Sequence, residues 1–461
     1  ARFVRLLNRH DIDVFETARE VTVDGTTYAA GESYVVPLAQ DQFTMIRAMF
    51  DRFTEFDENI FYDVSGWTLP LVYDLNYAAL GSGGFSSNLV GERAGGEAPA
   101  GAAPRQAEYG YVFDWADSQA PRALAHILKE GLLARAATEP FSVETDDGVV
   151  EMGRGAVFVP LEGQEASPAR VHAIVRAAAE DAGVTMHAAD SGRTPVAGRD
   201  LGAWTVFEAL QTPKVLLLFD GGFSRYDAGE VWWTLDHRMG LPVTMQQPDD
   251  LSYVDTSDYT HMVLVGGSIP FDEDQAEAIK EWVGDGGVLI AHTEAADWAQ
   301  THILGREAGD EEGEEAEGDP TARPRYDFEE LRLRDAEHVI GGALFAGDLD
   351  PTHPLGFGFL DREITLHRNA TFTLVPPEEN PFAEVVRYAD EPLLSGYASE
   401  RRLDEIGGTP AVIAEAHGRG AVILLADNPV FRGMYAGTER FLSNALFFGG
   451  FVDNPRGPYQ E

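Results

Sequence analysis

The sequence predicts an α/β protein in two parts: a duplicated α+β module over residues 1–205, then a doubly wound, parallel-sheet domain over residues 210–461. An internal repeat predicts the first part, because similar strings of residues recur about 120 positions apart. Short continuous apolar runs that alternate with helical patterns predict the second part, since buried parallel strands have this character. A strand, a glycine turn and a helix between Thr212 and Val243 open that alternation.

The repeat is centred on two Asp-Gly pairs, which are typical of hairpin turns. Asp24 and Pro37 of the first copy each recur 123 positions later, as Asp147 and Pro160. Each copy has one helical pattern before its hairpin and one after it, and these four predicted helices are 3–9, 41–53, 123–133 and 168–182. The copies therefore span about residues 1–80 and 108–205, with a Gly/Ala-rich linker over 81–107.

One element is present in only one copy. A strand predicted at Tyr109–Phe113 precedes the first helix of the second copy, whereas the first copy begins with its helix. We therefore expect the polypeptide to be a piece of a longer one.

In the second part, the predicted strands end at turns and the helices lie between them. The predicted strands are 215–219, 243–245, 262–265, 288–291 and 421–426, and the predicted helices include 272–284 and 437–448. The segments 360–375 and 383–395 are expected to form an inserted or appended β-rich section. The acidic segment 306–320 is expected to be a surface loop, because it lacks the ligand spacing of an EF-hand calcium site.

Composition excludes several functions. The net charge of −43 disfavours nucleic acid and anionic membrane surfaces as partners, because like charges repel. The absence of cysteine excludes disulfides and thiolate chemistry. No apolar run reaches the roughly 20 residues that a membrane span needs.

Polar and glycine residues gather where the predicted strands end, which is where doubly wound sheets bind ligands. The predicted ligand crevice contains Asp220, Gly221, Gly222, Gly266, Gly267, Ser268, His292, Thr293, Asp427, Asn428 and Arg432. Tyr435 is a further candidate for its lining. The alternative is purely structural, because strand-to-helix turns favour glycine and aspartate without any ligand.

His292 and Glu294 are the candidates for acid/base catalysis, because both are titratable and lie in a turn flanked by small residues. They could equally be polar residues that cap the following helix. Ser268 does not fit a nucleophile elbow, because bulky residues follow it. No metal site is predicted: His10 and Asp13 come nearest to a zinc-ligand pair, on what reads as a helix end.

Four segments resemble the large bacterial M14-family zinc carboxypeptidase-like proteins. They are VTVDGTTYAAGESYVVPLAQ (21–40), YDVSGWTLPL (62–71), YDAGEVWWTLDHRMGLPVT (226–244) and FRGMYAGTERFLSNALFF (431–448). The resemblance runs in order along nearly the whole chain. It implies a region that follows a secreted or periplasmic carboxypeptidase domain and ends in a flavodoxin-like, class I glutamine amidotransferase-like domain.

The resemblance also implies which chemistry is missing. The family's zinc ligands have no counterpart here, so zinc is expected only in the upstream carboxypeptidase domain of the same gene product, and no cofactor in this chain. The amidotransferase triad has no counterpart either, because the two relevant turns read Ala291-His292-Thr293-Glu294 and Asp427-Asn428-Pro429. We therefore expect a non-catalytic accessory region of a zinc metallocarboxypeptidase, which supports or gates that domain or helps it bind peptide. The alternatives are a binding module that uses the crevice for a small ligand or a protein, and an independent hydrolase.

Overall fold

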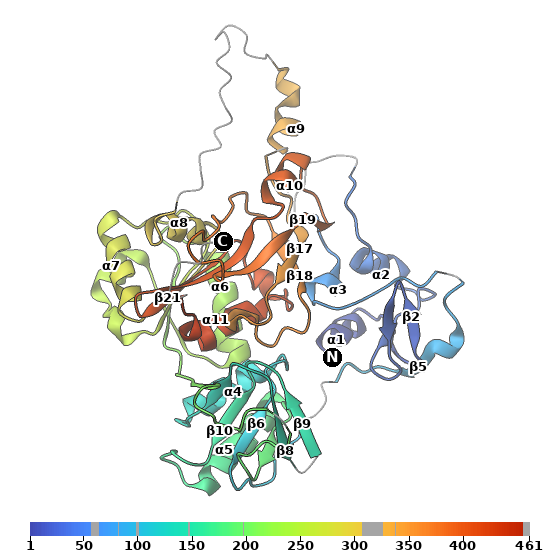
Figure 1. Ribbon diagram of the computed structural model, residues 1–461. Helices are drawn as coiled ribbons and strands as arrows, with labels where there is room; N and C mark the ends of the chain where they lie inside the picture. Colours follow the sequence, from blue (N-terminus) through green and yellow to red (C-terminus); the bar gives the residue numbers. More distant parts are fainter. Residues whose placement is uncertain are drawn as a thin grey trace.

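The computed structural model describes residues 1–56, 64–81, 83–97, 101–145, 148–196, 198–306, 326–336 and 338–454. Figure 1 shows three bodies: the two copies of the module and a larger α/β unit, against which both copies pack. Most of the acidic segment 306–320 lies outside the described residues. No described helix is long and apolar enough to cross a membrane.

The first module is a three-stranded sheet in the order β4-β1-β5, with a separate hairpin and flanking helices. Its elements are α1 (Arg2–Arg9), β1 (Phe15–Thr17), β2 (Val21–Val23), β3 (Thr26–Tyr28), β4 (Tyr34–Val35), α2 (Phe43–Phe50), α3 (Leu69–Val72) and β5 (Val90–Arg93). The expected linker 81–107 therefore contributes a strand, because β5 pairs with β1. Backbone pairing across the sheet outweighed the local Gly/Ser-rich composition there.

The second module is a five-stranded sheet in the order β11-β6-β10-β7-β12, covered by two helices. Its elements are β6 (Gly110–Phe113), α4 (Ala120–Lys129), β7 (Arg135–Ala137), β8 (Phe141–Thr145), β9 (Gly148–Met152), β10 (Val157–Pro160), α5 (Pro168–Ala182), β11 (His187–Ala189) and β12 (Phe207–Ala209). The ends of α5 follow local rules, because Ser167 caps its first turn and Gly183 leaves the helix with a φ of 71°.

Each of the two modules contains the same pair of internal hydrogen bonds at equivalent positions. The amide Nε2 of Gln40 donates to the carbonyl of Pro37 at 2.6 Å, and that of Gln164 donates to the carbonyl of Pro160 at 2.8 Å. The backbone N–H of Gly31 donates to the carbonyl of Thr17, and the backbone N–H of Gly155 donates to the carbonyl of Ala137. These matched bonds support the duplication inferred from the sequence.

The α/β unit is built on a nine-stranded sheet in the order β14-β13-β15-β16-β21-β20-β19-β17-β18. Its first half is parallel and comprises β13 (Val215–Leu218), β14 (Val243–Gln246), β15 (His261–Leu264), β16 (Val288–His292) and β21 (Gly420–Leu425). Its second half is antiparallel and comprises β17 (Ala343–Leu349), β18 (Glu363–Arg368), β19 (Glu384–Ser395) and β20 (Pro410–His417). The predicted α/β fold class is confirmed, and the β-rich section continues the main sheet.

Helices cover both faces of this sheet (Figure 1). They are α6 (Arg225–Trp232), which continues as a π-helical segment Trp233–Met239, α7 (Glu273–Gly284), α8 (Glu294–His302), α10 (Glu400–Ile406) and α11 (Glu439–Phe448). The short helix α9 (Leu331–Ala336) projects away from the sheet. A capping box between Asp272 and Gln275 starts α7. The π-helical segment ends at Gly240, which has a φ of 72°, as the Gly-x-Pro pattern predicts.

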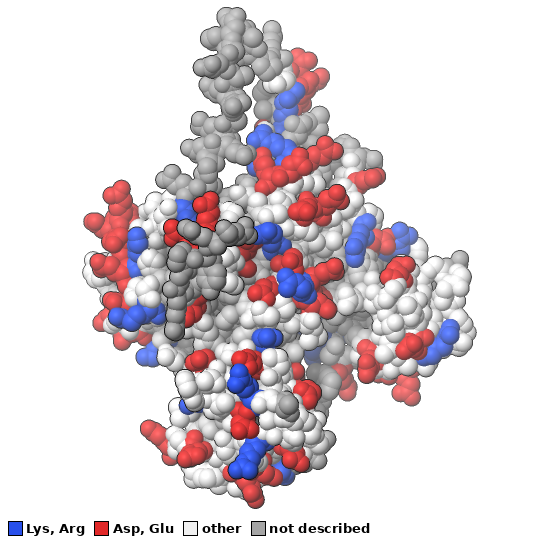
Figure 2. All heavy atoms as spheres, viewed as in Figure 1, with Lys and Arg blue, Asp and Glu red and all other residues white. Residues whose placement is uncertain are grey.

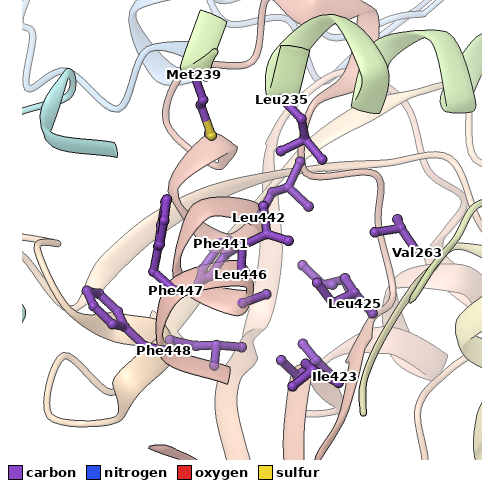
Figure 3. Packing of buried hydrophobic residues seen from close by; sticks show 14 of the residues in the cluster. Leu235, Met239, Val263, Ile423, Leu425, Phe441, Leu442, Leu446, Phe447 and Phe448 are labelled. Atoms are coloured by element: carbon purple, nitrogen blue, oxygen red, sulfur yellow. The ribbon is translucent and has the colours of Figure 1, made fainter. Parts of the chain in front are cut away.

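The hydrophobic core centres on α11, which is buried between the sheet and the second module. Its Phe441, Leu442 and Leu446 face the strand residues Ile423 and Leu425 (Figure 3). On the other side, Trp115 of the second module packs edge-on against Phe448 and donates its indole N–H to Asn444 at 2.7 Å. The core is therefore continuous from the second module into the α/β unit.

Acidic side chains are spread over the surface that Figure 2 shows, with basic ones interspersed, and do not gather into one patch. This distribution is that of a solubilising surface, because a steering patch for a cationic partner would concentrate the charge.

A buried ion pair joins the two halves of the nine-stranded sheet. Arg368, at the end of β18, is fully buried, and its Nη1 lies 3.3 Å from a carboxylate oxygen of Asp427, just after β21. The same Nη1 donates to the hydroxyl of Tyr388 at 2.9 Å, and that hydroxyl donates to Asp427. Burial raises the pKa of Asp427 to about 6, although Arg368 opposes that rise.

We predict that Arg368→Met lowers the free energy of unfolding by about 3–5 kcal/mol, because it leaves the Asp427 carboxylate buried without its partner. The double variant Arg368→Met/Asp427→Asn should recover part of that loss. Arg362→Met, which breaks the exposed pair with Asp348, is the matched control and should change little. Urea unfolding measures all three; equal losses for Arg368→Met and Arg362→Met would contradict the prediction.

Candidate functional site at the strand ends

A crevice of about 440 Å³ opens at the carboxyl ends of β15, β16 and β21. Doubly wound sheets bind their ligands outside the carboxyl ends of the strands, and this crevice lies there. Its lining residues are Ser224, Asp227, Gly267, Ser268, Thr293, Glu294, Asn369, Asn428 and Phe431. Of the residues proposed from the sequence, Gly267, Ser268, Thr293, Glu294 and Asn428 line it.

The turn between β16 and α8 is strained at Thr293, whose φ of 53° and ψ of −135° form a conformation that only glycine adopts easily. Its hydroxyl donates to the carbonyl of His292 at 2.7 Å. Gly266 allows this packing, because a Cβ there would lie only 2.3 Å from the hydroxyl of Thr293. The space beside Gly266, which was predicted to admit a ligand, is therefore occupied by the side chain of Thr293. Gly266 allows the turn to pack closely but does not line the crevice.

Two carboxylates face each other at the mouth of the crevice. Asp227 lies in the first turn of α6, which Ser224 caps, and Glu294 begins α8. The backbone N–H of Gly267 donates to Glu294 Oε2 at 3.1 Å. Burial raises the pKa of Asp227, and the nearby charge of Glu294 adds to that rise. The pair therefore favours a proton or a cationic group between its members.

A third carboxylate, Glu230, lies one helical turn beyond Asp227 and accepts a hydrogen bond from Asn428 Nδ2 at 2.7 Å. Burial raises its pKa to about 7, and the charge of Asp227 contributes, although the hydrogen bonds from Asn428 and the Arg432 backbone oppose the rise. Asn428 thus connects the crevice lining to a carboxyl group that is about half protonated at neutral pH.

Asp220, Gly221 and Gly222 do not line the crevice, contrary to prediction. Asp220 is paired with Arg225 at 2.8 Å, and the hydrogen bond from that guanidinium lowers its pKa. The carbonyl of Gly222 accepts a bond from the N–H of Ser268 at 3.0 Å, and a Cβ on Gly222 would clash with that residue. The two glycines therefore close a tight turn, which is the structural reading of this pattern.

His292 is also misplaced by the sequence-based prediction. It is fully buried and is not among the lining residues, and burial lowers its pKa to about 3. Its Nδ1 atom lies 3.4 Å from the hydroxyl of Thr293, which lines the crevice. Its Nε2 has no hydrogen-bond partner among the described residues. A histidine that is buried, neutral and outside the crevice lining does not fit the predicted role of a direct acid or base. Glu294 remains, exposed at the crevice mouth.

Asp427, Arg432 and Tyr435 lie behind or outside the crevice. Asp427 is committed to Arg368 and Tyr388, as described above. The Arg432 guanidinium lies 5.1 Å from the ring of the lining residue Phe431 and 5.6 Å from the ring of Trp67. Tyr435 is buried against His367. None of the three is among the lining residues of the crevice.

Sequence reasoning missed Ser224, Asp227, Glu230, Asn369 and Phe431. The Ser-x-x-Asp pattern at the start of α6 is a capping pattern that could have revealed the first two. Asn369 and Phe431 reach the crevice from the antiparallel edge and from a loop, and no local pattern marks them. Phe431 forms a rigid wall, because its ring stacks on that of His367 at 4.0 Å.

The described residues contain no group of three histidine, aspartate or glutamate side chains arranged to hold a metal ion.

No model of a known protein family matches the sequence, and no curated protein matches it. Among solved structures, a ThuA-like protein from Parabacteroides merdae aligns at 13% identity and a TM-score of 0.35, over 54% of this chain and 93% of its own. The CTPS glutaminase domain from Trypanosoma brucei aligns at 8% identity and a TM-score of 0.27, over 54% of this chain and 98% of its own. A β-galactosidase from Bacillus circulans aligns at 12% identity and a TM-score of 0.26, over 50% of this chain and 30% of its own.

The neighbours thus include an amidotransferase-like glutaminase domain, and this chain spans less than a third of the length of the galactosidase. At these scores the likenesses carry no conclusion about activity. The sheet order and the crevice stand on the geometry of this chain alone.

We predict that Thr293→Gly is more stable than Thr293→Ala by about 1–3 kcal/mol, because only glycine relieves the strained backbone. Both substitutions remove the hydroxyl and methyl groups, and only glycine also removes the Cβ that the backbone conformation disfavours. The greater freedom of glycine in the unfolded chain opposes its gain, so a higher stability of Thr293→Gly reports the strain. Thermal unfolding of the two variants measures it. Equal stabilities would show that the turn carries no such strain.

Proposed function

We propose that the α/β unit binds a small polar molecule with a protonated amine in the strand-end crevice, and does not hydrolyse glutamine. The observation that carries this proposal is that Asp227 and Glu294 both line the crevice, while Glu230 lies behind its lining residue Asn428. A cation between Asp227 and Glu294 would replace their mutual repulsion with two charge-assisted hydrogen bonds. A volume of about 440 Å³ is in the usual range for small-molecule sites.

The other walls suit the uncharged part of such a ligand. Asn369 and Asn428 offer amide donors and acceptors, and Phe431 offers an apolar face. Against hydrolysis, Thr293 occupies the strained turn where the amidotransferase resemblance would require a cysteine. The hydroxyl of Thr293 donates to the carbonyl of His292, and the Nδ1 atom of His292 lies 3.4 Å from that hydroxyl. Burial lowers the pKa of His292 to about 3, so this histidine is a weak base for activating the hydroxyl.

We predict that putrescine and ethanolamine bind to the full chain, whereas butanediol and ethylene glycol, the matched neutral compounds, do not. Affinity should rise as the pH increases from 6 to 8, because Glu230, with a pKa of about 7, loses its proton over that range and gains negative charge. Isothermal titration calorimetry measures both effects.

The variant Asp227→Asn/Glu294→Gln should weaken amine binding by about tenfold or more, since it removes both charges that flank the site. Glu277→Gln, on the exposed face of α7, is the matched control and should bind normally. Equal binding of amines and diols, or no effect of the double variant, would rule out this site.

A second proposal concerns the whole chain: an accessory region of a secreted or periplasmic zinc carboxypeptidase. The four segments that resemble that family, spread from residue 21 to residue 448, support it. We predict that the purified chain associates with a zinc carboxypeptidase domain from the same gene product and alters its peptide hydrolysis. Co-purification and peptidase assays test this, and a lack of association at micromolar concentration would exclude it.

A further inference from the structure

The two modules differ at one edge of their sheets. In the second module, β10 lies between β7 and β6. In the first module, β4 pairs with β1 on one side, and the described part of the chain places no strand on the other side. This open edge of β4 is the feature that carries the inference.

β4 and β10 correspond residue by residue. Tyr34 lies opposite Glu16 in the first module, and Val157 lies opposite Ala136 in the second. Val35 and Phe158 likewise lie opposite the preceding residues, Phe15 and Arg135. Because the two strands share this register, β6, which pairs with β10 in the second module, indicates what kind of strand would pair with the open edge of β4.

The same positions are buried in one module and open in the other. Val157 and Val159, which pair with β6, are fully buried, whereas their counterparts are more open: Tyr34 is 50% exposed and Val36 is half-buried. Leu38, just beyond β4, is 48% exposed. Large apolar side chains with this exposure on a strand edge mark an interaction surface.

The backbone of β4 has groups directed to the open edge. In an antiparallel pair, the backbone groups of successive residues point alternately toward and away from the partner strand. The N–H of Thr17 donates to Ser33 at 2.9 Å, so Val35 faces β1, and Tyr34 and Val36 point outward. The equivalent outward residues of the second module, Val157 and Val159, lie opposite Phe113 and Tyr111 of β6.

A groove lies beside this edge. Its volume is about 1540 Å³, and it lies between the first module, the second module and the α/β unit, all of which contribute lining residues. In the first module, α1, α2, the β2–β3 hairpin and β4 line it, through residues such as Phe3, Leu7, Ile46, Val23, Tyr34 and Val36. In the second module, the side chains of Tyr111 and Phe113 fill the corresponding core beneath α4 and α5.

We propose that the open edge of β4 binds an extended apolar segment of a partner protein, as an antiparallel strand in the register of β6. Its residues opposite Val36 and Tyr34 carry large apolar side chains, like those of Tyr111 and Phe113, and these fill the groove. The backbone supplies the affinity and the alternate side chains supply the specificity. A second copy of this chain offers no such strand among its described residues, because its β6 is held between β10 and β11.

The probe is a fluorescein-labelled peptide of residues 108–115, which contains β6, titrated with the full chain and followed by fluorescence anisotropy. We expect saturable binding. Val36→Pro removes the outward N–H without touching the pairing with β1, so it should weaken binding by about tenfold or more. Val196→Pro, at an exposed valine beside Pro195 in the second module, is the matched control and should bind as the wild type does.

A second peptide, N-methylated at the residue equivalent to Tyr111, should fail to bind the unaltered chain, because it cannot donate to the carbonyl of Val36. This arm keeps the test decisive if Val36→Pro misfolds, which circular dichroism detects. The proposal is overturned if the parent peptide does not bind, or if the methylated peptide binds equally well. If sedimentation shows a stable dimer and the dimer does not bind the peptide, the open edge of β4 pairs with a second copy of this chain, and the proposal is overturned.

Discussion

The ion pair between Arg368 and Asp427 constrains the α/β unit more than any other contact. The strands that carry these residues, β18 and β21, are separated by three strands in the sheet order. In a flat sheet, four spacings of about 4.8 Å would hold their backbones roughly 19 Å apart. The side chains nevertheless meet at 3.3 Å, so the antiparallel half must curl back over the end of the parallel half. Desolvating two charges makes any flatter arrangement costly, because each would lose its partner.

The crevice is a consequence of that curl. Asn369 follows Arg368 directly and Asn428 follows Asp427, so the pair that closes the sheet also brings both amides to one cavity. The carboxylates of Asp227 and Glu294 come from helices that start at the ends of the parallel strands. The site therefore combines carboxylates from the parallel half with two amides, one from each half of the sheet. This combination supports a ligand with one cationic end and one neutral polar end.

The duplicated module gives the chain a second surface of a different kind. One copy has a complete five-stranded sheet with its apolar residues covered, and the other presents the same strand edge to solvent. Because both copies share their register and their internal glutamine bonds, the complete copy serves as a template for what the open copy binds. The crevice and the strand edge lie on separate elements, so each can be tested without disturbing the other.

The sequence by itself determined the order of elements and most strand ends in the α/β unit, because apolar runs such as Val215–Leu218 and terminators such as Gly240 act locally. It also determined the duplication, and it located five crevice residues from their positions after strands. Tertiary structure alone decided which side chains face the crevice. His292, Asp427 and Arg432 were expected there, but a buried core, a distant guanidinium and the ring of Trp67 hold them elsewhere. The physical reason is that the direction of a side chain in a turn depends on partners far away in the chain, whereas the turn itself depends on its neighbours.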